Sequence, residues 1–201
     1  ETVLILDFGG QYTQLIARRV RELGVYSEII PFNTPEEAIR TKNARAIILS
    51  GGPSSVYEEG APHPDRAIIE MGVPVLGICY GVQLMAHFLG GEVKPSDRRE
   101  YGQAEIEVTA ESELLTGIAS PLKVWMSHGD RVLRLPPGWL VLGTSDNSPF
   151  AAVRHAERPI FGLQFHPEVA HTQGGAAMLR NFVQGVCGCR PSWTMDAFIG
   201  Q

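Results

Sequence analysis

Cysteine is scarce in this sequence. Its 201 residues contain 3 cysteines, Cys79, Cys187 and Cys189. An odd number without the spacing of a disulfide framework is typical of a reducing compartment, so we expect a cytoplasmic protein. Cys187 and Cys189 form a C-x-C pair, but no second pair accompanies them to complete a zinc site. A chain of this length buries about 70% of its unfolded surface, so it needs neither disulfides nor a metal to fold.

Long apolar runs and basic clusters are also missing. The longest apolar stretches, such as residues 3–6 and 46–49, are far too short to span a membrane. Strand-like residues begin at Thr2, so we expect no signal peptide. The sequence has 17 Lys and Arg against 22 Asp and Glu, a net charge of -5, and no block of basic residues. We therefore expect neither a membrane nor a nucleic acid among its partners.

The first half of the chain alternates apolar strand-like segments with helical patterns. A helix start is expected near residue 34, where Thr34 caps, Pro35 takes the first position and Glu37 completes a capping box. Apolar strands joined by helices indicate an α/β fold, with a mostly parallel sheet and helices on both faces. The other segments are strands at residues 2–8, 26–32, 44–49 and 73–78, and helices at residues 11–23, 65–71 and 82–89.

The second half of the chain is rich in strands joined by short turns, which predicts an additional, partly antiparallel β region. A helix is expected again at residues 175–186. Residues 187–201 do not extend the pattern, and their apolar side chains Trp193, Phe198 and Ile199 are expected to cover a surface of something else. The strands are expected at residues 105–109, 122–126, 139–145, 150–153 and 160–165.

Gly77-x-Cys79-x-Gly81 lies between a predicted buried strand and a predicted helix. A sharp strand-to-helix turn strains the backbone of its central residue and requires small neighbours two positions away. The Cys79 thiol would then stand at a helix N-terminus, where the helix dipole favours the thiolate. The pattern predicts that Cys79 is a catalytic nucleophile, against the simpler reading of a buried cysteine between packing glycines.

A cysteine nucleophile needs a base and a group that orients the base. His166 follows the last predicted strand, at the sheet edge where open α/β folds place ligands, and Glu168 lies two residues further on. We expect His166 to take the proton of Cys79 and Glu168 to hold the imidazole. His166, Glu168 and His171 also resemble a metal-ligand cluster, although Pro167 argues against a helical arrangement of these ligands.

An oxyanion hole is expected beside the nucleophile. The turn supplies the backbone N–H of Tyr80, and the loop after the third strand supplies the N–H of Gly52. The alternative is that the two glycines of this loop only make a turn.

Three motifs together resemble the class I (triad) glutamine amidotransferases. They are Gly-Ile-Cys-Tyr-Gly-Val-Gln at residues 77–83, Ser-Gly-Gly-Pro at residues 50–53 and Phe-His-Pro-Glu at residues 165–168, in the family's order Cys, His, Glu. The resemblance covers residues 2–186 and implies a flavodoxin-like fold elaborated by extra strands. It also implies hydrolysis of L-glutamine through a thioester on Cys79, with no cofactor and no metal in this domain.

Further segments are similar to the amidotransferase domain of GMP synthetases, notably residues 6–15, 126–130 and 166–172. This resemblance implies that residues 1–187 form the amidotransferase domain, and that residues 188–201 are a linker and the start of an ATP-pyrophosphatase (synthetase) domain. That partner domain would use ATP, Mg and XMP to make GMP in purine biosynthesis, and a homodimer would form through it.

The same resemblance implies the substrate contacts. Gln83 would contact glutamine from the helix after the nucleophile, while Ser127 and His128 would offer backbone groups to its α-amino and α-carboxylate groups. Asp130 would either support the site or face the partner domain.

Two alternatives remain at this stage. One is a cysteine hydrolase of the same fold that acts on γ-glutamyl or peptide substrates. The other is a non-catalytic regulatory module that kept the fold.

Overall fold

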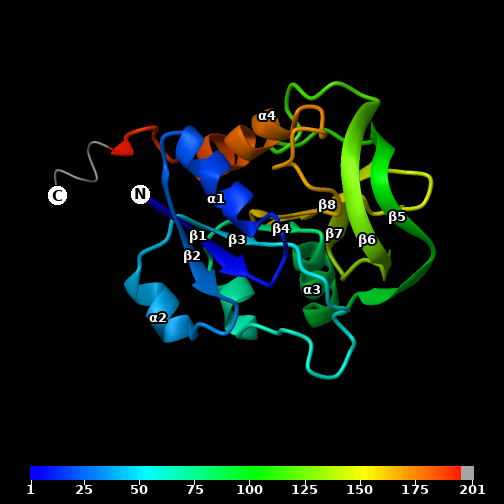
Figure 1. The fold of residues 1–201 in the computed structure, drawn as a ribbon, viewed down its shortest axis with the longest axis horizontal. Coiled ribbons are helices and arrows are strands. Elements are labelled where there is room, and N and C mark those ends of the chain that lie inside the picture. Colours follow the sequence, from blue (N-terminus) through cyan, green and yellow to red (C-terminus); the bar gives the residue numbers. More distant parts are fainter. Residues whose placement is uncertain (196–201) are drawn as a thin grey trace.

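The computed structural model describes residues 1–195, which fold around one twisted sheet (Figure 1). The strand order is β2-β1-β3-β4-β9-β8-β7-β5-β6. The first five strands of this order pair in parallel, and the remaining pairs are antiparallel. The strands are β1 (Thr2–Asp7), β2 (Tyr26–Pro31), β3 (Ala46–Leu49), β4 (Val75–Ile78), β5 (Glu92–Val108), β6 (Leu122–Arg134), β7 (Trp139–Thr144), β8 (Ala152–His155) and β9 (Ile160–Leu163).

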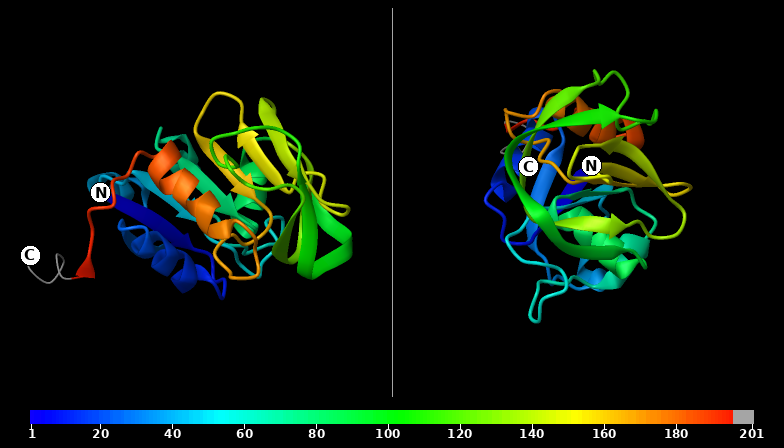
Figure 2. Two further views of the ribbon diagram at one scale, coloured as in Figure 1. Left: turned by 90° about the horizontal axis from the view of Figure 1, so that it is seen from above. Right: turned by 90° about the vertical axis from the view of Figure 1, so that its right-hand side faces the viewer.

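Helices cover both faces of the parallel part (Figures 1 and 2). On one face, α1 and the pair α4–η2 bury side chains such as Ile16 and Phe182 against β1, β3, β4 and β9. On the other face, α2, η1 and α3 bury Ile39, Ile68 and Leu84. The helices are α1 (Thr13–Glu22), α2 (Glu36–Thr41), the 3-10 helix η1 (Arg66–Glu70), α3 (Tyr80–Phe88), α4 (Gly175–Arg180) and the π-helix η2 (Asn181–Val186). No helix among the described residues is both long and apolar enough to cross a membrane.

The predicted fold class is therefore confirmed: a parallel α/β core carries an antiparallel second half. The central strands alternate their buried side chains between two cores, so their buried positions are apolar. In β1, for example, Val3 and Ile5 face one core and Leu4 and Leu6 the other.

Two expectations for local structure are wrong. Thr34 does not cap α2, because its hydroxyl donates to the carbonyl of Pro31, and Pro35 is the N-cap residue without a side-chain cap. Trp193 packs against this chain itself rather than being left to cover another surface. Its ring contacts Tyr26 at 5.9 Å between centroids, and its backbone N–H donates to the Gly24 carbonyl. The expectation for Phe198 and Ile199 lies outside the described residues.

Two strands of the antiparallel half, β5 and β6, are longer than expected. β5 and β6 form a ribbon that continues past the parallel sheet, and Figure 2 shows it standing beside the carboxyl ends of the parallel strands. This ribbon matters for the site because one of its segments, residues 127–130, borders the cavity described below.

Candidate active site

Cys79 lies in the sharp turn between β4 and α3. Its backbone has φ 54° and ψ -105°, in a region that residues with a side chain rarely adopt. The flanking glycines are required by close packing: a Cβ on Gly81 would lie 2.5 Å from the Leu49 carbonyl oxygen, and one on Gly77 would lie 2.7 Å from the Gly81 carbonyl carbon. The turn therefore holds the thiol at the start of α3, in the conformation that the motif predicts.

His166 and Glu168 lie beside the thiol in the loop after β9. His166 Nδ1 is hydrogen-bonded to Glu168 Oε1 at 2.6 Å, and the imidazole lines the same cavity as Cys79. Burial lowers the pKa of His166, but the hydrogen bonds to Cys79 and Glu168 outweigh burial and raise it to about 10. Glu168 Oε2 is buried and has no hydrogen-bond partner among the described residues, so the carboxylate faces the imidazole alone.

The loop that carries His166 is tied to β6. The His166 N–H donates to the Trp125 carbonyl at 3.0 Å. Thr172 bridges the same two residues, since its hydroxyl donates to the His166 carbonyl at 2.6 Å and accepts from the Trp125 N–H at 3.0 Å. From the opposite side, Arg19 of α1 donates to the Glu168 carbonyl at 2.9 Å. The imidazole is thus positioned by contacts from two elements.

The metal-ligand alternative for this loop is not supported. The described residues contain no group of three or more His, Cys, Asp or Glu side chains that could hold a metal ion. The His171 ring lies against Trp125 at 4.8 Å between ring centroids, tilted by 38°, and Cys187 and Cys189 are buried free thiols.

The glycine loop after β3 approaches both groups. A Cβ on Gly51 would lie 3.0 Å from His166 Cε1 and 3.6 Å from Cys79 Cβ, so the loop packs closely against both residues. Gly52 packs instead against Phe8, and its N–H makes no hydrogen bond to the described part of the chain. Tyr80 is the first residue of α3, where backbone N–H groups lack helical partners.

Strand β6 borders the thiol on another side. Cys79 Sγ lies 3.4 Å from the Ser127 carbonyl oxygen, which can accept its proton in a hydrogen bond. Gln83 is 3% exposed, so it is not a solvated helix residue: its side-chain amide donates to the Asp130 carbonyl and to Gln164 Oε1, both at 3.2 Å. Gln164 in turn lies 3.7 Å from Cys79 Sγ through Nε2. Sequence reasoning missed Gln164, although its position two residues before His166 is a signal that could have revealed it.

Asp130 supports the site, because its carboxylate is hydrogen-bonded to the loop after β3. Its carboxylate accepts hydrogen bonds from Ser55 Oγ at 2.5 Å and from the Tyr57 hydroxyl at 2.7 Å. Burial and the hydrogen bond to Asp130 raise the pKa of Tyr57. The loop after β3 is thereby fastened to β6 across the front of the site.

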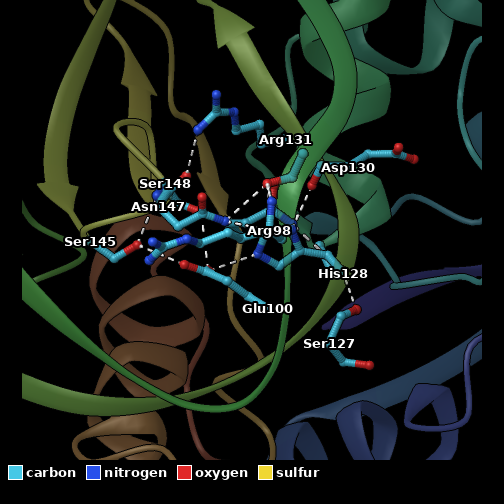
Figure 3. A network of polar contacts seen from close by, with 12 residues as sticks. Arg98, Glu100, Ser127, His128, Asp130, Arg131, Ser145, Asn147 and Ser148 are labelled. Carbon is cyan, nitrogen blue, oxygen red and sulfur yellow. Dashed lines mark hydrogen bonds and ion pairs between the residues drawn. The ribbon is translucent and has the colours of Figure 1, made fainter.

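A second imidazole–carboxylate pair stands behind the Ser127–Asp130 segment (Figure 3). His128 lies with Nε2 3.1 Å from Glu100 Oε2 and Nδ1 2.5 Å from the Asp130 carbonyl oxygen. Ser145 and Ser148 also donate to the Glu100 carboxylate. Burial raises the pKa of Glu100, but the contacts with His128 and the two hydroxyls outweigh it, and the pKa is lowered.

These groups surround a cavity of about 680 Å³ at the carboxyl ends of the parallel strands. The residues predicted from the sequence converge on it: Cys79, His166, Gly52, Gln83, Ser127 and His128 all line it, together with Gly51 and Asp130. Glu168 does not line the cavity but lies behind His166, to which it is hydrogen-bonded. Tyr80 is the first residue of α3.

Residues 4–186 match the family described as glutamine amidotransferase class-I. The chain belongs to this family. It is 53% identical over 199 residues to GMP synthase (glutamine-hydrolyzing) of a Nostoc species, and 54% identical over 197 residues to that of Aquifex aeolicus. These matches cover 99% and 98% of the amidotransferase chain but only 37% and 39% of the two relatives. The chain thus spans well under half of the relatives it matches.

Solved structures agree with this assignment. A Thermoplasma acidophilum protein provisionally described as one of the subunits of a GMP synthase matches with a TM-score of 0.84 at 32% identity, over 93% of this chain and 94% of that one. A Thermotoga maritima glutamine amidotransferase has the same fold, with a TM-score of 0.68 at 22% identity, over 91% of this chain and 80% of that one. The present chain is a glutamine amidotransferase domain closely related to the glutaminase part of GMP synthases.

Proposed function

We propose that Cys79, His166 and Glu168 are the catalytic triad of glutamine hydrolysis. Cys79 Sγ attacks the side-chain amide carbon of L-glutamine, and His166 delivers a proton to the nitrogen as the carbon–nitrogen bond breaks. Ammonia leaves, and a γ-glutamyl thioester remains on Cys79. A water molecule, deprotonated by His166, then attacks the thioester carbon, which releases glutamate and restores the thiol. The observation that carries this proposal is the strained Cys79 backbone beside the hydrogen-bonded His166–Glu168 pair.

The amide oxygen becomes negatively charged during each attack and needs donors. We assign this role to the backbone N–H groups of Gly52 and Tyr80. The Gly52 N–H makes no hydrogen bond to a described residue, and Tyr80 directly follows Cys79 as the first residue of α3. Loss of one such donor typically costs about 10²- to 10³-fold in rate.

The substrate contacts are proposed from the cavity lining. Ser127 and His128 present backbone to the cavity, where it can meet the α-amino and α-carboxylate groups of glutamine. Gln83 donates hydrogen bonds to the Asp130 carbonyl and to Gln164, so its role in substrate binding is to hold the wall of the cavity in shape. This hydrolysis requires no cofactor.

The complete enzyme is proposed by analogy with the GMP synthases. Ammonia would pass to an ATP-pyrophosphatase domain that uses ATP and Mg to convert XMP to GMP in the cytoplasm, with residues 1–187 as the amidotransferase domain and residues 188–201 leading into the partner. A homodimer would form through the synthetase half. Support comes from 53% identity to a GMP synthase and from the share of that relative, 37%, that this chain spans.

The test is ammonia release from glutamine by this chain, with Cys79→Ala beside it, repeated after a GMP synthetase catalytic half, ATP, Mg and XMP are added. We expect slow release that depends on Cys79 and rises on addition. Turnover of γ-glutamyl or peptide substrates, but not of free glutamine, would favour the alternative hydrolase. Folded protein without release under either condition would favour a regulatory module.

A further inference from the structure

Strand β5 contains a large irregularity opposite the site. Pro95 pairs with Asp130 and Glu100 pairs with His128, so the four residues 96–99 of β5 stand opposite Gly129 alone. Bulges of this kind occur next to active sites, where they redirect a side chain. The segment 96–99 is called the β5 bulge below.

The β5 bulge is held at both ends. Asn147 Nδ2 donates to Ser96 Oγ at 3.0 Å and to the Arg98 carbonyl at 2.8 Å. At the other end, the buried pair of Glu100 and His128 fixes the return to regular pairing (Figure 3). A segment with this many anchors has a defined backbone although it lies at the surface.

The bulge places Arg99 at the cavity. Its side chain lies along Gly129, since a Cβ added there would be 3.7 Å from Arg99 Nε and 3.8 Å from its Cδ. Arg99 lines the cavity, and among the described residues that do so it is the one lysine or arginine. It makes no hydrogen bond or ion pair with any described residue, so its guanidinium is available to a ligand. Arg98, its neighbour, does not line the cavity.

We propose that Arg99 binds the α-carboxylate of glutamine, an inference that rests on the proposed function and names a specificity determinant for it. Ser127 contacts Cys79 Sγ, and Gly129 lies two residues further along β6, about 6–7 Å away for an extended strand. Three carbon atoms separate the amide carbon of extended glutamine from its carboxylate carbon, which is a comparable span. A guanidinium meets a carboxylate with paired, charge-assisted hydrogen bonds.

The charges at the cavity mouth suit a zwitterion. Glu58 and Asp130 line the same cavity and supply negative charge for an α-ammonium group. The partners of the Asp130 carboxylate are the hydroxyls of Ser55 and Tyr57, which are neutral donors and leave its charge uncompensated. An amide without the amino-acid head group would gain nothing from these residues.

The test uses the full chain and two reagents that alkylate Cys79. One is the chloroketone analogue of glutamine, which keeps the α-amino and α-carboxylate groups. The other is iodoacetamide, which has neither group and reports the reactivity of the thiol itself. Second-order labelling rates at Cys79, read by peptide mass spectrometry, are compared for wild type, Arg99→Gln, Arg99→Lys and the matched control Arg98→Gln.

We expect Arg99→Gln to slow the chloroketone by about 10- to 100-fold, the effect of losing one charge-assisted contact, and to leave the iodoacetamide rate unchanged. The chloroketone labelling rate of Arg99→Lys should fall between those of wild type and Arg99→Gln, and the rate of Arg98→Gln should equal that of wild type. An unchanged chloroketone rate in Arg99→Gln, or an equal loss with both reagents, overturns the assignment. Wild-type Cys79 that shows no preference for the chloroketone overturns the proposed function as well.

Discussion

His166 Nδ1 lies 2.6 Å from Glu168 Oε1, and both side chains are almost entirely withdrawn from solvent, at 5% and 1% exposure. A buried carboxylate with a single partner acts on that partner at low dielectric, where its charge is strongest. Glu168 therefore orients the imidazole and favours its protonated form, which the proposed mechanism needs when His166 delivers a proton to the departing nitrogen.

Glu168→Gln should reduce kcat for glutamine hydrolysis by about 10²- to 10⁴-fold, because the amide keeps the shape but neither carries the charge nor fixes the tautomer. KM should change little, since Glu168 lies behind His166 and does not line the cavity. Steady-state ammonia release measures both constants. The matched control is Glu157→Gln, at an exposed position of the turn before β9. Equal kcat values for the two variants would remove Glu168 from the mechanism.

The Glu100–His128 pair should make the free energy of unfolding depend on pH. The pKa of Glu100 is lowered in the folded protein, so its ionised form stabilises the fold above its ordinary value of 4.5, and this contribution is lost as the pH falls through the lowered pKa. Glu100→Gln should therefore cost most near neutral pH, on the order of 1–3 kcal/mol, and progressively less at lower pH. Urea unfolding of both proteins between about pH 7 and pH 3 measures the difference. A difference that grows on acidification would contradict the pairing.

Gly81→Ala should destabilise the protein by about 1–3 kcal/mol and reduce Cys79 reactivity, because the new methyl group would lie 2.5 Å from the backbone oxygen of Leu49. Either the turn or β3 must shift to accommodate it. Gly185→Ala is the matched control: it lies in the helical segment η2, and a Cβ there meets nothing within 4 Å. That variant should be neutral or gain up to about 1 kcal/mol from helix propensity. Similar midpoints of thermal unfolding for the two variants would refute the packing argument.

Much of the parallel core follows from sequence pattern alone. Residues 3–6 of β1 and all of β3 are apolar because they are buried on both faces, and the turn around Cys79 has a signature that depends on local sterics. His166 could be placed beside Cys79 because parallel strands end at one edge of the sheet. The structure brings both side chains against Gly51 and into one cavity at that edge.

The β5–β6 ribbon could not be predicted in full. Residues 92–104 are mostly polar and exposed, so they lack the apolar alternation that identifies a strand, and Pro95 within them argues against one. Consequently the sequence pattern does not predict the β5 bulge, the partner of His128 or the position of Arg99. Gln83 shows the same limit, since its burial depends on Asp130 and Gln164, which are distant in sequence.

The capping role expected of Thr34 failed for a different reason. Thr34 can satisfy its hydroxyl with either the helix start or the preceding carbonyl, and local sequence does not decide between them. The contacts of the two glycines after β3 are likewise not readable from local sequence: the structure places Gly51 against His166 and Gly52 against Phe8.

The most direct measurement is intact-mass spectrometry of the chain quenched in acid during turnover of glutamine, with Cys79→Ser and His166→Asn beside it. The account predicts that wild type gains the mass of one γ-glutamyl group, that peptide mapping places it on Cys79, and that hydroxylamine removes it as expected for a thioester. His166→Asn should form little adduct, because the leaving nitrogen receives no proton. Steady ammonia release without any adduct on Cys79, or an adduct that persists in Cys79→Ser at another residue, would contradict the account.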